Sequence, residues 1–216
     1  WRGKAVEVGP LARLAMLYAS GHEETKALAE KLVIAANGQD GLRTVSLRPH
    51  LIYGPGDPHL IPRFVAACKA GRLKQIGAGH NKVDVTYIDN AAWSHVLAAE
   101  ALASTGKPAG KAYFIGDGDP VNLWDWLNHL MERLELPKLA KGPGASKAIL
   151  LARVVEWVYR NFRLAGEPPL SRFMVEHLVY PHYYDMSAAA NDFNYRSIVG
   201  EQEALDKTVE WARNLR

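Results

Sequence analysis

The sequence predicts an α/β fold in which helices alternate with the strands of a parallel sheet. An apolar strand from Thr44 to Leu47 runs into an Arg-Pro break and a Tyr-Gly-Pro-Gly turn, as a buried parallel strand does where it delivers its carboxyl end to a site. Residues 82–88 alternate in polarity and lead into a helix that begins near Asp89. A third strand, 112–115, precedes a helix at 122–136.

The composition is that of a soluble globular protein of one or two domains. The 26 Lys and Arg are spread among 23 Asp and Glu without a cationic block, which argues against nucleic-acid binding. Cys68 is the only cysteine, so no internal disulfide and no thiolate metal cluster can form. Together with the lack of a signal-like or membrane-spanning stretch, this predicts a cytoplasmic protein.

Helical periodicity gives the remaining elements their expected faces. The helix from Glu24 to Ala36 carries Leu28 and Leu32 on one side, with Lys26, Glu30 and Lys31 available for the other, and Asn37-Gly38 ends it. A helix from His59 to Gly71 places Cys68 on its buried side. Asp89 is expected to be the N-cap of the next helix. That helix is expected to bury Ala92, Val96, Leu97 and Ala101.

The helix from Ser146 to Leu164 presents a broad apolar arc that includes Val154, Trp157 and Phe162. Packing into the core or as a lid is the commoner role for such an arc. Covering a lipid-like substrate or resting on a membrane surface is the alternative. The turn Asp117-Gly118-Asp119-Pro120 lacks the spacing of a calcium loop, so we interpret it as structural and predict no metal site.

The run from Leu47 to Asp57, the segment Thr25-Lys26-Ala27-Leu28-Ala29-Glu30 and the tail with Phe193-Asn194-Tyr195-Arg196 resemble extended short-chain dehydrogenases. The resemblance is to the branch of 3β-hydroxysteroid dehydrogenases and sterol or 3-oxo-acid reductases, from about Thr25 to the end. It implies the carboxyl-terminal part of a Rossmann-like NAD(P)-binding fold plus a small, mostly helical substrate-binding region. The implied division is an atypical segment 1–24, a partial dinucleotide-binding domain 25–116 with an interleaved substrate-region helix, and a substrate-capping region 117–216.

The resemblance also implies roles for individual residues. Lys26 aligns with the lysine of the Tyr-x-x-x-Lys pair, in which the ammonium lowers the phenol pKa and contacts the cofactor; His22 stands where the tyrosine is expected. The nicotinamide of NAD or NADP is expected along Pro49, His50, Leu51 and Ile52, and the substrate near Tyr53 and Arg63. Each has a plainer alternative: His22 has no role, Lys26 and Arg63 are ordinary exposed cations, and His50 is structural or solvated.

Residues 1–22 resemble instead a segment of the large subunit of nickel-iron hydrogenases. That subunit holds its metals through paired Cys-x-x-Cys motifs, so a chain with one cysteine cannot carry its chemistry. The pattern predicts a chimaeric junction near Glu23, or an accidental likeness of an amphipathic helix from Leu11 to Tyr18.

The function implied by the dehydrogenase resemblance is NAD(P)-dependent oxidoreduction of a CH–OH group in a 3β-hydroxysteroid or a 3-hydroxy/3-oxo acyl substrate. The isolated chain is expected to be inactive, because the tyrosine and a glycine-rich nucleotide loop are not in place. The alternatives are a non-catalytic lipid-binding or interaction module and, least supported, a hydrogenase fragment. Expected partners are an apolar small molecule, a membrane surface contacted peripherally, and a second copy or a complementing N-terminal half.

Overall fold

The computed structural model describes residues 5–8, 21–166, 168 and 170–215, with side chains from residue 25 onward. The hydrogenase-like segment therefore lies largely outside the described residues, and so does the side chain of His22.

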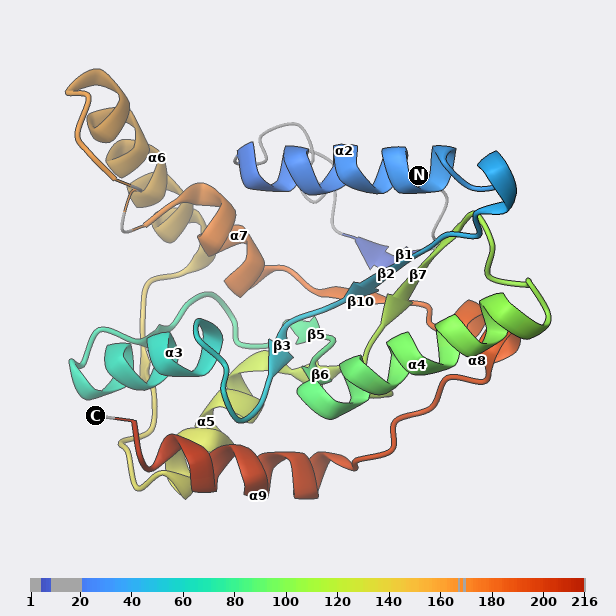
Figure 1. The fold of residues 1–216 in the computed structure, drawn as a ribbon. Coiled ribbons are helices and arrows are strands. Elements are labelled where there is room, and N and C mark those ends of the chain that lie inside the picture. The colour runs from blue at the N-terminus through green and yellow to red at the C-terminus, as the bar shows by residue number, and fades with distance from the viewer. Residues whose placement is uncertain (1–4, 9–20, 167, 169, 216) are drawn as a thin grey trace.

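The centre of the α/β arrangement is a parallel pair of strands, β2 (Val45–Pro49) and β7 (Lys111–Ile115). Their register runs from Val45 opposite Lys111 to Pro49 opposite Ile115. Helix α2 (Gly21–Ala35) lies on one side of the pair and helix α4 (Ile88–Ser104) on the other, and both contact β2 (Figure 1). The parallel strand predicted at 44–47 is thus confirmed, with helices on both faces.

Shorter strands continue the structure beyond the carboxyl end of β2. Strand β3 (Ile52–Tyr53) pairs in parallel with β6 (Thr86–Tyr87). A four-stranded sheet has the order β1 (Ala5–Val8), β10 (His182–Tyr184), β5 (Lys82–Val83), β8 (Val121–Asn122). Strand β4 (Lys74–Gln75) pairs in parallel with β9 (Ala140–Lys141).

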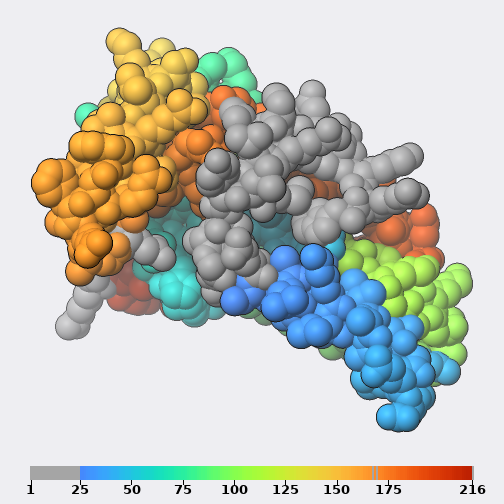
Figure 2. All heavy atoms as spheres, turned by 90° about the horizontal axis from the view of Figure 1, so that it is seen from above, coloured from blue at the N-terminus to red at the C-terminus, as the bar shows by residue number. Residues whose placement is uncertain are grey.

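The other helices surround these strands. They are the 3-10 helix η1 (Gln39–Gly41), α3 (Leu60–Lys69), α5 (Leu123–Arg133), α6 (Ala145–Asn161), α7 (Arg172–Val179), α8 (Ser187–Phe193) and α9 (Glu201–Ala212). One core lies among α3, α5 and α9, a second among α4, β7 and α8, and a third, of Ala148, Ala152 and Val175, between α6 and α7. Figure 2 shows α6 (yellow to orange) at one end of the molecule, away from α2 (blue).

Several local predictions are confirmed. The helix predicted at 122–136 is α5, which begins after an Asn122 cap whose side chain accepts from Trp124 N–H at 3.0 Å. The tail that contains Phe193-Asn194-Tyr195-Arg196 is ordered, and β10, α8 and α9 follow one another there. Gly54 has a φ of 141°, and a Cβ there would lie 2.7 Å from Ile88 Cγ2, so only glycine fits the turn after β3.

Other local predictions are wrong. Leu28 and Leu32 of α2 are 57% and 63% exposed, and the helix instead turns Glu30 toward β2. Helix α4 buries Asn90, Ala91, Ser94, Ala98 and Ala101 rather than Ala92 and Val96. It begins at Ile88, not after a cap at Asp89, and the Asp117 carboxylate accepts from Tyr87 N–H at its start. The strand predicted at 82–88 is split into β5 and β6 around a buried Asp84.

The apolar arc of α6 points outward. Leu150, Val154, Trp157 and Phe162 are each at least half exposed, so simple core packing, the commoner expectation for this arc, is not seen. Within the described part of the chain, no helix has the length and apolar character needed to cross a bilayer.

Candidate active site

An ion pair fixes helix α2 against the carboxyl-terminal part of β2. The Glu30 carboxylate accepts from Arg48 Nε at 2.6 Å, from Arg48 Nη2, and from Ser46 Oγ at 2.8 Å. These contacts hold the pKa of Glu30 below its ordinary value, the hydrogen bond from Arg48 being the main cause. The Arg48 guanidinium also lies over the ring of Phe114, 5.1 Å from its centroid. Since Glu30 follows Lys26 by one helical turn, this anchor sets where Lys26 lies relative to β2.

The backbone is strained where β2 ends. Leu51 has a φ of 41°, which is uncommon for a residue with a Cβ. Hydrogen bonds hold it in place: His50 N–H donates to Ile115 O at 3.1 Å, Thr86 Oγ1 donates to His50 O at 2.6 Å, and Thr86 N–H donates to Leu51 O at 3.3 Å. Backbone strain that several hydrogen bonds hold in place is found preferentially at functional sites.

Three histidines form a cluster beside this turn, namely His50, His177 of α7 and His182 of β10. His50 Nε2 lies 2.7 Å from His182 Nδ1, and His182 Nε2 lies 2.8 Å from the carbonyl oxygen of His177. A carbonyl only accepts, so neutral His182 carries its proton on Nε2 and its Nδ1 accepts from His50 Nε2–H. The tautomer of His50 is thereby fixed, and its Nδ1 is left as an acceptor.

Burial keeps these histidines neutral. It lowers the pKa of His50 to about 3 and that of His182 to about 4, with the neighbouring imidazoles adding to the shift. The pKa of His177 is lowered by the same cause. At neutral pH the cluster is therefore an uncharged donor–acceptor chain rather than a cationic one.

A buried carboxyl group lies in the segment between β5 and β6. Asp84 is 2% exposed; its Oδ2 accepts from Tyr184 N–H at 2.7 Å, and its Oδ1 has no hydrogen-bond partner among the described residues. Burial raises the pKa of Asp84 to about 6. The Tyr184 ring in turn stacks on Phe114 at 3.9 Å and meets His50 edge-on at 5.2 Å. The anchor of α2 and the histidine cluster therefore belong to one packed set of side chains.

Comparison with known proteins identifies the family. Residues 11–141, more than half of the chain, match the 3-beta hydroxysteroid dehydrogenase/isomerase family. The chain belongs to that family. The match begins inside the segment that resembles a hydrogenase, so the hydrogenase interpretation and a junction at Glu23 are not supported.

Curated relatives within this dehydrogenase family agree. The chain is 46% identical to the 2-alkyl-3-oxoalkanoate reductase of Stenotrophomonas maltophilia over 84% of its own length and 54% of the relative. It is 34% identical to the decarboxylating sterol-4-alpha-carboxylate 3-dehydrogenase of Mus musculus, over 90% of the chain and 55% of that protein. The chain thus spans about half the length of the curated relatives it matches.

Solved structures show the same fold at low sequence identity. A dTDP-glucose 4,6-dehydratase double mutant from Streptomyces venezuelae with bound NAD superimposes with a TM-score of 0.59 at 21% identity, over 88% of this chain and 50% of that one. The UDP-glucuronic acid 4-epimerase of Bacillus cereus with NAD gives 0.58 at 18% identity, over 91% and 53%. The chain therefore has the same α/β fold as about half of each of these two proteins.

The structure brings some of the predicted site residues together. Pro49, His50, Leu51 and Ile52 form the strained end of β2 and the start of β3, and Ile52 is 41% exposed. The backbone contacts expected for a nicotinamide carboxamide are partly engaged, because both the N–H and the C=O of His50 already bond to β7 and β6. Lys26 lies exposed on α2.

The two residues predicted to contact the substrate, Tyr53 and Arg63, lie outside the histidine cluster. Tyr53 is fully buried in edge contacts with Tyr87 and Trp126, at centroid distances of 5.7 and 5.0 Å, and burial raises the pKa of its phenol. Its ring is a core side chain in this structure. Arg63 is exposed on α3. Neither side chain joins the histidine cluster.

Sequence reasoning missed His182, His177 and Asp84. His182 lies 132 positions from His50 along the chain, and nothing in the residues around Pro181 indicates the pairing. The sequence carried no signal for a buried Asp84, because this residue occupies a polar position of the alternating run 82–88, where a side chain is expected to face solvent.

Proposed function

We propose that this chain is the carboxyl-terminal portion of an NAD(P)-dependent oxidoreductase that interconverts a CH–OH group and a ketone. The observation that carries the proposal is the end of β2, strained and held by hydrogen bonds, with the helix of Lys26 anchored to it through Glu30 and Arg48. Membership of the dehydrogenase family supports this assignment.

The cofactor fits the residues that are present. Pro49 to Ile52 would lie along the nicotinamide, with His50 Nδ1 available as an acceptor for its carboxamide, and Lys26 would contact the cofactor from α2. Bound NAD(P) supplies or accepts the hydride. The chain's own residues would hold the ring and keep a neutral imidazole near it.

The substrate class follows from what the relatives' names share. The Stenotrophomonas protein is named for a 3-oxo carboxylate, and the mouse protein for oxidation at position 3 of a sterol 4-carboxylate. In both, the reacting carbon lies two carbons from the carboxylate carbon and the rest of the molecule is apolar. We infer that the substrate is a 3-hydroxy or 3-oxo carboxylate with a large apolar substituent. Reduction adds a hydride to carbon 3 and a proton to its oxygen.

Activity is expected only when the tyrosine and the glycine-rich nucleotide loop are supplied. The sequence carries His22 where the tyrosine is expected, and the usual loop is not among these residues. The test is a chimaera in which the N-terminal half of the Stenotrophomonas reductase, including its own active-site tyrosine, replaces residues 1–24. We expect the chimaera to oxidise NADPH or NADH with a 2-alkyl-3-oxoalkanoate, and the unmodified chain to show only the background rate.

A matched control fixes the role of Lys26. Lys26→Met in the chimaera should lower kcat by about 100-fold or more, within the range for loss of acid–base assistance. Lys31→Met, at another exposed position on the same helix, should leave kcat within twofold. A folded chimaera that binds the cofactor without turnover, or hydride transfer by the unmodified chain, would contradict the proposal.

Partners follow from the surface. The exposed Leu28, Leu32 and Val33 of α2 suit a second copy of the chain or a complementing N-terminal half, and the exposed arc of α6 suits peripheral contact with a membrane. The same arc favours a second candidate function, a lipid-binding module without catalysis. Binding of fatty ligands by a chimaera that binds neither NAD nor NADP would support this second function.

The one cysteine, a buried thiol, is compatible with the cytoplasm as the working compartment.

A further inference from the structure

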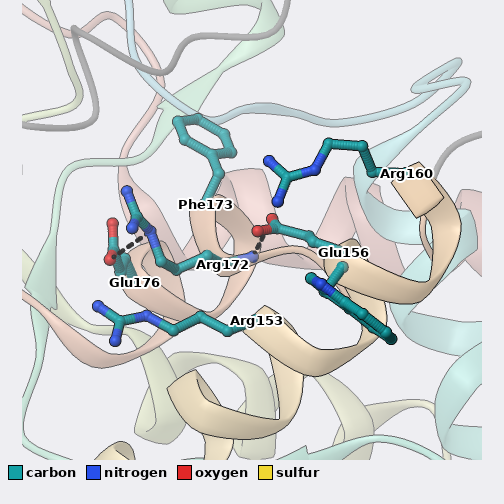
Figure 3. A pocket seen from close by; sticks show the side chains of 7 residues that line it. Arg153, Glu156, Arg160, Arg172, Phe173 and Glu176 are labelled. Atoms are coloured by element: carbon teal, nitrogen blue, oxygen red, sulfur yellow. Dashed lines mark hydrogen bonds and ion pairs between the residues drawn. The ribbon is translucent and has the colours of Figure 1, made fainter.

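A cleft of about 580 Å³ lies between α6 and α7, and its lining has not been assigned a role so far (Figure 3). The N-terminal half of α6 packs on α7 through Ala148, Ala152 and Val175, and the cleft lies beside residues 153–160. Its volume falls in the range of about 300–1,000 Å³ that is usual for small-molecule sites.

The two carboxylates of the cleft already have partners. Glu156 Oε1 accepts from the backbone N–H of Arg172 at 2.6 Å, where α7 begins and its dipole favours negative charge. Glu176 forms an ion pair with Arg172 Nε at 3.3 Å. Both carboxylates are thus part of the joint between the two helices.

Two guanidinium groups remain. Within the part of the chain that the structure describes, no ion pair or hydrogen bond is formed by the side chain of Arg153 or Arg160. They lie seven residues apart on one face of α6, about 10 Å along its axis, with Glu156 between them. Figure 3 shows both reaching over the cleft from α6. Two guanidinium groups on one helix face, without ion pairs or hydrogen bonds among the described residues, suit the binding of a planar oxyanion.

The charge and the lining of the cleft restrict the class of ligand that can bind there. Three arginines and two glutamates give the lining a net charge of +1, which a monovalent anion neutralises and a divalent phosphate would exceed. Trp157, which is 53% exposed, and Phe173 supply apolar surface between the charges. The ligand therefore combines one carboxylate with an apolar chain.

We propose that the cleft between α6 and α7 binds a medium-chain alkanoate, with its carboxylate on Arg153 or Arg160 and its alkyl chain against Trp157 and Phe173. The cleft adjoins the histidine cluster, because the Phe173 ring packs on His177 at 4.0 Å and His177 on His182 at 5.0 Å. It is nonetheless separate from the end of β2. The proposal therefore requires neither cofactor binding nor hydride transfer.

The test is equilibrium binding of decanoate to the full chain by calorimetry, with decan-1-ol and decyl phosphate as comparison ligands. We expect decanoate to bind at least tenfold more tightly than the uncharged alcohol and more tightly than the phosphate. The double variant R153Q/R160Q should lose at least tenfold in decanoate affinity and should bind decanol unchanged. R163Q, which removes one positive charge just beyond the end of α6 and outside the cleft, should keep decanoate affinity within twofold.

Three results would overturn the proposal. Equal affinity for decanoate and decanol would remove the role of the arginines, and tighter binding of decyl phosphate would contradict a monoanion site. Loss of binding to anionic vesicles in R153Q/R160Q, without any decanoate binding by the parent chain, would assign the arginines to a membrane surface instead. Circular dichroism of each variant checks that the helices are retained. The chimaera's hydride-transfer assay is a separate measurement, so failure of one proposal does not decide the other.

Discussion

At the scale of single residues, the histidine cluster shows how burial selects a neutral imidazole. Two histidines whose pKa values are lowered to about 3 and about 4 stay uncharged, so each ring nitrogen must act as donor or acceptor according to its neighbour. The carbonyl of His177 fixes His182, and His182 fixes His50. His182 of β10 thus sets which ring nitrogen of His50 can accept a hydrogen bond at the end of β2.

The His182→Gln variant should make the chain less sensitive to acid. In the unfolded chain His182 gains a proton near its ordinary pKa of 6.5, whereas the folded chain keeps it neutral down to about 4. Stability is therefore lost as the pH falls through this window, by about 3 kcal/mol at most. A glutamine amide can donate and accept but does not titrate. The difference in unfolding free energy between variant and parent, measured in urea, should shift in favour of the variant as the pH falls from about 7 to about 4.5.

The buried carboxyl groups change the stability in the opposite direction as the pH falls. The measurement therefore compares the His182→Gln variant with the parent chain. Asp84 and Asp117, whose pKa values are raised to about 6, make the folded state more stable as the pH falls toward 4, and they contribute equally to parent and variant. His80→Gln, at an exposed position, is the matched control and should leave the pH dependence of the parent unchanged. A His182→Gln chain with the parent's pH dependence would show that His182 is not held neutral.

At the scale of elements, the joint between α2 and β2 is electrostatic rather than apolar. Glu30 and Arg48 have side chains that are only 15% and 19% exposed, and Ser46 occupies a further acceptor site of the same carboxylate. Hydrogen bonds between charged groups are worth about 1.5–3 kcal/mol each when they are shielded from water. The position of the helix that carries Lys26 therefore depends on one carboxylate.

The Glu30→Gln variant should lower the free energy of unfolding by about 2 kcal/mol, because a neutral amide cannot accept from both Arg48 nitrogens and the two charge-assisted hydrogen bonds are lost. The measurement is the urea midpoint at neutral pH. Glu100→Gln, an exposed glutamate on α4, is expected to change stability by less than about 0.5 kcal/mol. In the active chimaera Glu30→Gln should also lower kcat, with the affinity for cofactor less affected. An unchanged midpoint would mean that apolar contacts alone hold α2.

How far the sequence predicts these elements depends on whether apolar residues are the buried ones. Apolar residues are the buried ones in β2, β7 and α5, and the positions and types of these elements are predicted within a few residues. In α4 the buried face carries Asn90, whose amide bonds to the Asp117 carboxylate and to the backbone of Ile198 and Val199. The hydrogen-bond partners of Asn90 lie up to 109 residues away along the chain. Helical periodicity does not detect such partners, so it placed Ala92 and Val96 on the buried face of α4.

At the scale of the whole molecule, two features leave exposed the surfaces on which we propose that a partner binds. Among the described strands β2 pairs only with β7, which leaves one edge of β2 unpaired, and unpaired edges attract further strands. Helix α2 exposes Leu28, Leu32 and Val33 at 57%, 63% and 41%. A strand supplied by an N-terminal half would cover the first surface, and a helix of a second copy would cover the second.

These two surfaces can be separated by substitution. If the chain self-associates through α2, L28E/L32E should shift it toward the monomer, because like charges on facing helices repel and the apolar surface is lost. Sedimentation over a range of concentrations measures the shift, which we expect to be at least tenfold in the dissociation constant. I198E places a charge at a 58% exposed apolar position outside α2 and should leave association unchanged. Association that survives L28E/L32E would point to the open edge of β2, since strand pairing there uses backbone groups that neither substitution alters.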